Sequence, residues 1–282
     1  MAEILEQSVE HGRFQTHFLE SGGGAGTPVL FLHGSGPGVS SRANWERTLS
    51  SSLATSRRLV APDVLGFGRT IGPLELATHG ARVQQLASFI ASTIPGPLDI
   101  VGNSMGGGLA LALAHEYPDA VRSLVLMGTV GIPFRVGAGL EQVWGYEPSV
   151  ESMRSLIELF AFNPSLVSDD LVELRYMASI EPGVQERFRA SFGPPFQRHA
   201  DEMALSVDDL GSIVQPVLLL HGAEDRVIPL EDTSLKLVRV LPNAQLVVFG
   251  ACGHWTQIER ATDFVDHLTW FFSSLDRRSR TD

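Results

Sequence analysis

Short apolar runs of strand length alternate along the chain with stretches in which apolar positions recur at helical spacing. Runs with few polar positions are typical of strands covered on both faces of a sheet, and they occur at Pro28–Leu32, Arg58–Asp63, Leu98–Val101 and Val121–Gly128. Helical spacing is found at Asn44–Leu53, Val83–Ile94 and Leu109–Ala114. This alternation predicts an α/β fold with a mostly parallel sheet flanked by helices. Phe14–Glu20 is expected to be an amino-terminal edge strand.

The pattern changes between Gly131 and Ser206. This part is helical in character, has no convincing buried strand and is interrupted by prolines. The earlier rhythm then returns, with strands expected at 216–222 and 244–249 and helices at 234–240 and 264–275. An insertion between two runs of strand–helix units indicates a helical cap over the carboxyl edge of the sheet. We therefore expect a core of residues 1–130 and 207–282 and a cap of residues 131–206.

Composition narrows the class of protein. The chain has 282 residues, of which 44% are hydrophobic, and a chain of this size buries a large core. The net charge of −11 argues against a surface for nucleic acid or anionic membrane. An anionic substrate would therefore need a local positive group.

The cellular compartment is predicted from the cysteine count and the amino terminus. Cys252 is the only cysteine, which excludes an intrachain disulfide and favours a reducing compartment. The segment Met1–Glu6 lacks the features of a signal peptide, and no apolar run approaches the roughly 18 residues of a membrane span. We expect a cytoplasmic protein.

A Gly-x-Ser-x-Gly pattern joins the third strand to the helix after it. Gly102-Asn-Ser-Met-Gly106 follows Leu98–Val101 and precedes Leu109–Ala114. In this context a serine sits on a sharp turn with its hydroxyl above the sheet, and the glycines allow backbone to approach backbone. A simple Gly-Ser loop is the alternative, but the flanking strand and helix favour a nucleophile at Ser104.

A serine hydroxyl needs a base, and the base needs an orienting acid. Asp225 follows the strand that ends at His221, and His254 follows the strand that ends at Gly250. The chain order serine, acid, histidine is that of a nucleophile-elbow hydrolase. Glu224 is a competing acid one residue away, and we prefer Asp225. The three predicted catalytic residues are Ser104, Asp225 and His254.

An oxyanion hole requires two backbone N–H groups. One is expected from Met105, the residue after the nucleophile, and the other from the loop after Leu32. In that loop the amide of Ser35 is the expected donor, with Gly36 as the alternative, and His33 is interpreted as a residue that braces the loop. No cluster has the spacing of a metal site, and the glycine loop lacks the ending of a phosphate-binding loop. We expect no metal and no cofactor.

Taken together, these residues resemble the α/β-hydrolase family over nearly the whole chain. A narrower resemblance is carried by six segments: His33-Gly-Ser-Gly-Pro-Gly38, Asn44-Trp45, Gly102-Asn-Ser-Met-Gly-Gly-Gly108, Val143-Trp-Gly-Tyr146, Arg175 and Gly253-His-Trp-Thr-Gln-Ile-Glu259. In these segments the chain is similar to the meta-cleavage product hydrolases, which cut a carbon–carbon bond in 2-hydroxy-6-oxohexa-2,4-dienoates during aromatic catabolism. Cap segments 143–146 and 170–182 look most like the branch that acts on monocyclic products, such as 2-hydroxymuconic semialdehyde and its alkyl relatives.

The resemblance implies a reaction. The dienol is first ketonised, and Ser104, deprotonated by His254, attacks the C6 carbonyl. Cleavage of the C5–C6 bond gives 2-hydroxypenta-2,4-dienoate and an acyl-serine, which water then hydrolyses to a carboxylic acid. The resemblance also implies a homodimer or a larger assembly of identical chains.

The resemblance further assigns binding residues. Arg175 would hold the substrate carboxylate, with Gly36, Asn44, Asn103 and Trp255 shaping the dienoate end. Other interpretations remain open at this point: Arg175 as an exposed helix arginine, Asn103 as a cap of the turn, and Trp255 as ordinary packing.

The remaining assignments concern the C6 substituent and the rival functions. Trp144 and Val227 are candidates for the pocket that receives the substituent, although apolar residues in a cap are usually core. After Gly66-Phe-Gly68 many relatives carry a Thr/Ser-Asp-x-Pro turn, whereas this chain has Arg69-Thr-Ile-Gly-Pro73. The departure concerns the surface contacts of that loop and not the catalytic residues. A carboxylesterase of the same fold is the main rival enzyme, and a ligand receptor with slow turnover is the alternative from another class.

Overall fold

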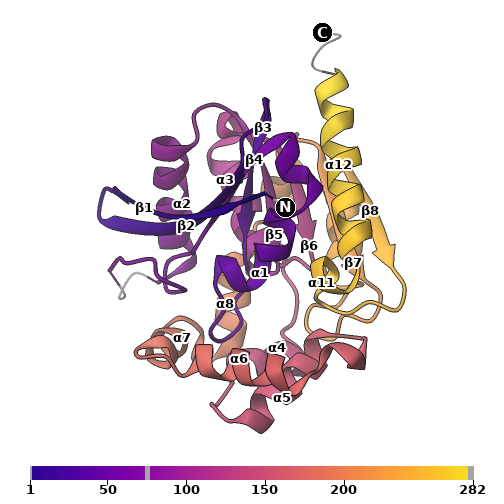
Figure 1. Ribbon diagram of the computed structural model, residues 1–282. Coiled ribbons are helices and arrows are strands. Elements are labelled where there is room, and N and C mark those ends of the chain that lie inside the picture. The colour runs from indigo at the N-terminus through magenta and orange to yellow at the C-terminus, as the bar shows by residue number, and fades with distance from the viewer. Residues whose placement is uncertain (1, 74–76, 279–282) are drawn as a thin grey trace.

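The chain folds around one eight-stranded sheet with the strand order β1-β2-β4-β3-β5-β6-β7-β8 (Figure 1). The computed structural model describes residues 2–73 and 77–278. The six strands from β3 to β8 run parallel to one another, as the alternation of strands and helices predicted, whereas β2 is antiparallel to β4. The strands are β1 (Ile4–His11), β2 (Phe14–Gly22), β3 (Gly26–Leu32), β4 (Arg57–Pro62), β5 (Leu98–Asn103), β6 (Val121–Met127), β7 (Val217–Gly222) and β8 (Ala244–Phe249).

The amino-terminal edge differs from the expectation. The strand at Phe14–Gly22 is not the edge, because Ile4–His11 pairs antiparallel with it and forms the outermost strand. β1 is mostly exposed and carries polar residues, so it lacks the apolar run by which buried strands are recognised. The prediction of a strand was right, and its position at the edge was wrong.

Helices cover both faces of the sheet. One face packs against α2, α3 and α10, and the other packs against α1 and the long carboxy-terminal helix α12. Serine or threonine side chains cap the starts of α1, α2, α5 and α6, each accepting from the N–H three residues on, as helix amino termini require. The helices of this core are α1 (Ser41–Leu49), α2 (His79–Thr93), α3 (Met105–Glu116), α9 (Val207–Gly211), α10 (Ser234–Val240), α11 (Thr256–Glu259) and α12 (Ala261–Arg278).

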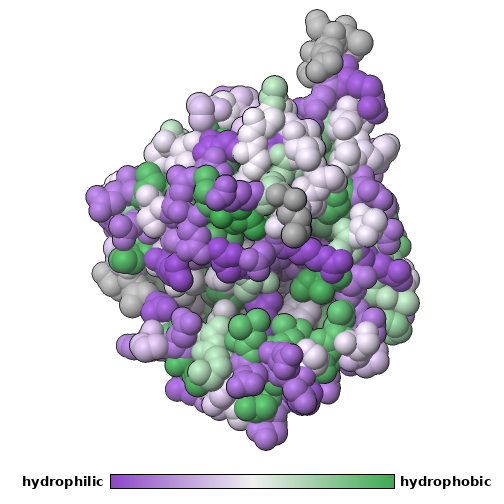
Figure 2. Space-filling view, viewed as in Figure 1, coloured by the Kyte–Doolittle hydropathy of each residue, from purple (hydrophilic) through white to green (hydrophobic). Residues whose placement is uncertain are grey.

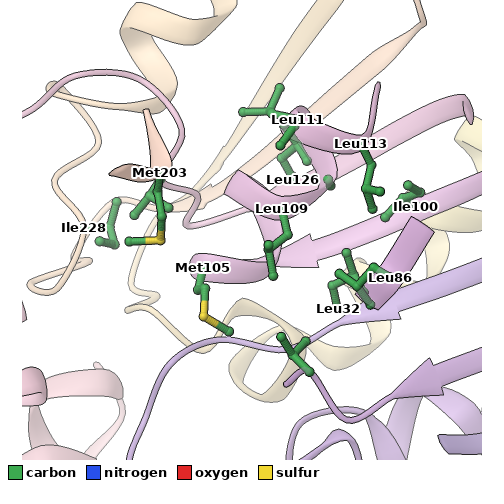
Figure 3. Close-up of a cluster of buried hydrophobic side chains, with 14 of the residues drawn as sticks. Leu32, Leu86, Ile100, Met105, Leu109, Leu111, Leu113, Leu126, Met203 and Ile228 are labelled. Carbon is green, nitrogen blue, oxygen red and sulfur yellow. The ribbon is translucent and has the colours of Figure 1, made fainter. Parts of the chain in front are cut away.

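The largest buried cluster lies between the sheet and α3. The helix is apolar on all sides, since every residue from Met105 to Ala114 is buried. Figure 3 shows Leu109 and Leu113 projecting from α3 among side chains of the neighbouring strands and α2, with Met203 and Ile228 near the end of α3 that begins at Met105. This packing fixes the start of α3, where Ser104 lies, against three different parts of the chain.

Between β6 and β7 the chain forms a group of helices and no strand within the described residues. These helices lie together at the carboxyl end of the parallel strands, at the bottom of Figure 1. Figure 2 shows apolar surface among polar residues in this part of the molecule, where Leu174 and Met177 of α6 are 67% and 53% exposed. The helices are α4 (Ala138–Trp144), α5 (Val150–Phe160), α6 (Asp169–Ser179), α7 (Val184–Phe192) and α8 (Phe196–Met203).

A buried ion-pair network joins the opposite, amino-terminal ends of the strands. Asp99 of β5 is fully buried and accepts from the guanidinium of Arg122 at 2.8 Å and 2.5 Å and from the Ser123 hydroxyl at 2.6 Å. Arg57 of β4 lies 3.6 Å from the same carboxylate, and Asp276 of α12 pairs with both arginines. The network therefore ties α12 to three strands.

None of the helices in residues 2–73 and 77–278 has the combination of length and apolar character needed to cross a bilayer.

Replacing Asp99 by alanine is expected to lower the free energy of unfolding by about 3–5 kcal/mol, because buried Arg57 and partly buried Arg122 lose their shared carboxylate. Denaturant unfolding followed by circular dichroism measures the change. Asp169→Ala is the matched control, because its pairing with Arg154 is on the surface and its loss should cost less than about 1 kcal/mol. Equal losses in the two variants would contradict the assignment of the Asp99 network as buried support.

Candidate active site

Ser104 occupies the sharp turn between β5 and α3. Its backbone has φ 53° and ψ −114°, a conformation that non-glycine residues rarely adopt. A Cβ on Gly102 would lie 2.4 Å from the carbonyl oxygen of Gly106, and one on Gly106 would lie 2.2 Å from the carbonyl oxygen of Leu32. The two glycines are therefore required by the close approach of β5, α3 and β3.

Asp225 and His254 are brought together by the turns after β7 and β8. The Nδ1 atom of His254 lies 2.7 Å from Oδ2 of Asp225, and the two side chains are 4% and 1% exposed. The other carboxylate oxygen of Asp225 accepts from the N–H groups of Val227 at 2.8 Å and Ile228 at 2.9 Å. Glu224, the competing acid, is exposed to solvent.

The charge of Asp225 is strongly favoured by these contacts. Burial opposes ionisation, but the charge of His254 and hydrogen bonds from His221 and His254 hold the pKa of Asp225 well below its usual range. A carboxylate in this state keeps its charge at neutral pH and fixes the His254 ring with Nδ1 as donor. The opposite nitrogen, Nε2, is then the one available as a base.

The loop after β3 is braced as predicted. The N–H of Val64 donates to Nε2 of His33 at 3.0 Å, and Nδ1 of His33 lies 2.8 Å from the carbonyl oxygen of Gly34. Because Nε2 accepts, the ring proton is on Nδ1 and is donated to Gly34. The brace fixes the loop segment that carries Ser35 next to the nucleophile.

Met105 and Ser35 are the residues whose backbone amides are the expected oxyanion donors. Met105 is the first residue of α3, and N–H groups in the first turn of a helix have no acceptor within it. Ser35 is buried, and its hydroxyl accepts from Nε1 of Trp144 at 3.0 Å. This bond joins α4 to the loop after β3.

One cavity lies between the sheet and the helices of the insertion, and both Ser104 and His254 line it. Its walls have a polar part and an apolar part. The polar part and the loop after β3 contribute Gly34, Ser35, Gly36, Asn44, Asn103 and Arg175. The apolar part is formed by Pro37, Val39, Leu140, Val143, Met153, Leu156, Ile157, Phe160, Val227, Trp255 and Ile258.

Arg175 is not an exposed helix arginine. It reaches from α6 to the core, where it donates to the carbonyl oxygen of Ala43 at 2.8 Å and lies 5.7 Å from the ring centre of Trp255. Burial lowers the pKa of Arg175 to about 10, so the guanidinium stays charged at neutral pH. Within the described residues no carboxylate lies at ion-pair distance from it. The cavity wall therefore contains a partly buried cation with no carboxylate of the described residues beside it.

Three further predicted residues lie in the same wall. Asn44 is buried, and its side-chain N–H group has no hydrogen-bond partner in the structure. Asn103 donates to the carbonyl oxygen of Met127 at 3.3 Å, so its amide bonds across to the end of β6, and the residue also lines the cavity. Trp255 stacks on Phe160 with ring centres 5.0 Å apart. It also contacts Arg175 and lines the cavity.

The chain matches known proteins over most of its length. The family model for the alpha/beta hydrolase fold matches residues 27–261. The chain belongs to the α/β-hydrolase family. It is 48% identical to a 2-hydroxy-6-oxo-2,4-heptadienoate hydrolase of Pseudomonas putida, over 90% of this chain and 91% of that protein. It is 46% identical to a 2-hydroxymuconate semialdehyde hydrolase of Pseudomonas sp. strain CF600, over 90% and 89%.

Solved structures place the chain in the same group. A meta-cleavage product hydrolase from Pseudomonas fluorescens IP01, a serine-to-alanine mutant complexed with acetates, superposes with a TM-score of 0.92 at 42% identity. The match covers 95% of this chain and 98% of that one. Within the α/β hydrolases, the chain is thus a member of the meta-cleavage product hydrolases.

This hydrolase differs in one place from the expected pocket. Val227 lines the cavity, whereas Trp144 is not among the lining residues; its neighbour Val143 takes that place. Trp144 instead stacks on Phe192 of α7 and bonds to Ser35. Consecutive residues of a helix point about 100° apart, so a motif that spans both does not show which one faces the cavity.

Other residues of the site were missed by sequence reasoning. Phe160 of α5 stacks on both His254 and Trp255, and its carbonyl oxygen accepts from the N–H of His254 at 2.8 Å. Its sequence signal is that of any apolar position in an amphipathic helix. The same applies to Leu140, Met153, Leu156 and Ile157, which line the apolar wall.

In the part of the chain that the structure describes, no group of three or more His, Cys, Asp or Glu side chains is placed to hold a metal ion.

The Gly106→Ala variant is expected to lose at least about 10²-fold in kcat/KM toward any acyl substrate, because its Cβ would displace Leu32 and shift Ser104 and the Met105 amide. Steady-state kinetics on a chromogenic ester measures this. Gly80→Ala is the control, since nothing lies within 4 Å of a Cβ at this helical position and alanine favours the helix. Full activity in Gly106→Ala would show that the close approach is not needed.

Proposed function

We propose that this chain hydrolyses the C5–C6 bond of a 2-hydroxy-6-oxohexa-2,4-dienoate to 2-hydroxypenta-2,4-dienoate and a carboxylic acid. The observation that carries the proposal is the partly buried cation of Arg175, unpaired with any carboxylate of the described residues, in the cavity that Ser104 and His254 also line. A carboxylate substrate supplies the missing anion. The names of the two relatives reported above support a monocyclic substrate of the 2-hydroxymuconic semialdehyde or 6-alkyl type.

In the proposed reaction, Ser104, His254 and Asp225 act together. After the dienol has moved its O2 proton to C5, the C6 carbonyl is attacked by Oγ of Ser104, and the hydroxyl proton passes to Nε2 of His254. Asp225 holds the resulting imidazolium through the 2.7 Å contact at Nδ1. The acid, base and nucleophile are each supplied by a turn at the carboxyl end of a different strand.

The amides of Ser35 and Met105 are the proposed oxyanion donors, with that of Gly36 as the alternative for Ser35. When the tetrahedral species collapses, the C5–C6 electron pair moves through the C3–C4 double bond to the C2 oxygen. The proton that His254 took from Ser104 leaves with the dienol product, whose C2 oxygen is protonated, and His254 becomes neutral again. The acyl group stays on Ser104. Water then attacks it with His254 as base, and the acid leaves.

The proposed binding mode separates the two ends of the substrate. Arg175 pairs with the carboxylate, while Asn44, whose amide N–H group is unpartnered, donates to the oxygens at the same end. Asn103 and Trp255 border this end as well. The C6 substituent would lie against the apolar wall that includes Val227.

The wider organisation is proposed on the same basis. We assign residues 1–130 and 207–282 to a catalytic core and residues 131–206 to a cap, because α4, α5 and α6 supply cavity walls and α4 to α8 supply no strand of the sheet. We also propose that the enzyme is a homo-oligomer. We further propose that it acts in the cytoplasm, because a single cysteine is typical of proteins in a reducing compartment.

Mixing the protein with 2-hydroxymuconic semialdehyde, its 6-methyl analogue and its 6-phenyl analogue is expected to bleach the yellow dienolate, fastest for the first two. Ser104→Ala should lower kcat by roughly 10⁴-fold or more. Absorbance in a stopped-flow instrument measures both, with p-nitrophenyl acetate assayed alongside. Turnover of the ester without any bleaching would replace the proposal by a carboxylesterase, and formation of 2-hydroxypenta-2,4-dienoate by Ser104→Ala at the wild-type rate would remove the serine from the mechanism.

Replacing Arg175 by methionine is expected to lower kcat/KM for the dienoate by about 10- to 100-fold, the worth of a charge-assisted hydrogen bond, and to leave p-nitrophenyl acetate hydrolysis almost unchanged. The ester carries no carboxylate, so its turnover reports on the catalytic residues alone. Arg154→Met is the matched control, an arginine of the cap that pairs with Asp169 on the surface. Parallel losses on both substrates would show that Arg175 supports the fold rather than the carboxylate.

A further inference from the structure

His221 is a fully buried histidine directly behind the Asp225 carboxylate. It lies in β7, one residue before the end of the strand, and its side chain is 0% exposed. Its Nε2 atom lies 2.9 Å from the carbonyl oxygen of Ile228 and 3.4 Å from Oδ2 of Asp225, and its Nδ1 atom lies 2.7 Å from the hydroxyl of Ser234. A buried imidazole with every nitrogen paired to a defined partner has a single orientation.

The partners of His221 fix its proton. A carbonyl oxygen only accepts, so Nε2 carries hydrogen, and in a neutral ring Nδ1 accepts from the Ser234 hydroxyl. The N–H of Nε2 is then shared between Ile228 and Asp225. Ile228 also donates its own N–H to the other oxygen of Asp225 at 2.9 Å, which closes a ring of hydrogen bonds from strand to turn.

Asp225 is therefore contacted by two imidazoles through the same oxygen. His254 approaches Oδ2 at 2.7 Å and His221 approaches it at 3.4 Å. A second donor on a carboxylate oxygen withdraws negative charge from the first, so the strength of the Asp225–His254 bond depends on how much of Oδ2 the other ring occupies.

We propose that His221 is a positioning residue that orients Asp225 and sets the basicity of His254 through it. This inference rests on the proposed serine hydrolase function, since it concerns the acid of the same catalytic group. Loss of the Nε2 donor would leave Oδ2 to His254 alone, strengthen that bond and favour the imidazolium form. His254 would then hold its proton up to a higher pH.

Other groups around the pair keep the prediction simple. Cys252 lies in the same loop as His254, and burial raises the pKa of its thiol to about 12, so it keeps its proton in the assay range. Glu259 of α11 accepts from the N–H of Gly253 at 2.7 Å. From α5, the ring of Phe160 covers His254.

The test compares two amide side chains at position 221. His221→Asn reaches the Ser234 side but not Asp225, whereas His221→Gln places a donor where Nε2 lies. The acidic limb of the kcat/KM profile should move upward by about half a pH unit in His221→Asn, the worth of one weak hydrogen bond, and return toward the wild-type position in His221→Gln. Ser234→Ala, which changes the far side of the ring, should leave the limb in place.

The measurements separate this inference from the proposed function. The profiles are recorded on p-nitrophenyl acetate as well as on the dienoate, and the proton between His254 and Asp225 is followed by its low-field NMR signal, which needs no turnover. If the dienoate is not hydrolysed, the proposed function is wrong, but the His221 test still holds because the ester profile and the NMR signal do not depend on the dienoate. If His221→Asn does not fold, His221→Phe takes its place.

The role of His221 would be overturned if neither the acidic limb of the kcat/KM profile nor the NMR titration shifts in His221→Asn. A fall in rate that is equal at every pH would not rescue it. Equal shifts in His221→Asn and His221→Gln would also overturn it, because the effect would not depend on a donor at Nε2. A shift in Ser234→Ala as large as that in His221→Asn would do the same.

Discussion

The backbone conformation of Ser104 is the constraint on which the site depends. A non-glycine residue at φ 53° persists only when its surroundings hold it, and here the carbonyl oxygens of Gly106 and Leu32 lie where side chains on the two glycines would otherwise be. The apolar packing of α3 against the sheet supplies that restraint, as every side chain from Leu109 to Ala114 is buried. The large core thus serves the placement of one hydroxyl and one amide.

Two charged side chains of the site, Asp225 and Arg175, have opposite surroundings. Asp225 has each carboxylate oxygen occupied by donors of the protein, whereas Arg175 meets one backbone carbonyl and an aromatic face. An anion whose hydrogen-bond partners all come from the protein can hold a neighbouring residue in place. A cation with few such partners can bind an anionic ligand. This difference, more than the motif around Ser104, points to an anionic substrate.

Much of the fold was predictable because local signals agreed with the tertiary structure. The strand at Ala244–Phe249 and the helix at Ser234–Val240 begin and end where the pattern predicts them, and Ser104, Asp225 and His254 follow strand ends that a parallel sheet brings to one edge. The exposed strand β1 was missed because it has no apolar run. Whether Arg175 is buried, or which of Val143 and Trp144 faces the cavity, depends on how α4 and α6 pack, and their sequences do not contain that information. His221 was noted only as a strand residue, since its role arises from a turn that folds back over it.

The apolar wall of the cavity has a different origin from its polar end. Leu140 and Val143 come from α4, and Met153, Leu156 and Ile157 come from α5, while Ser104, Asp225 and His254 belong to turns of the sheet. Much of the apolar wall is thus encoded in one contiguous stretch of about twenty residues, separate from the turns that carry the catalytic residues, while Val227 and Trp255 of the same wall are neighbours of those residues in the chain. Exchange of that stretch between related genes would change the surface that contacts the substrate and leave the catalytic residues as they are.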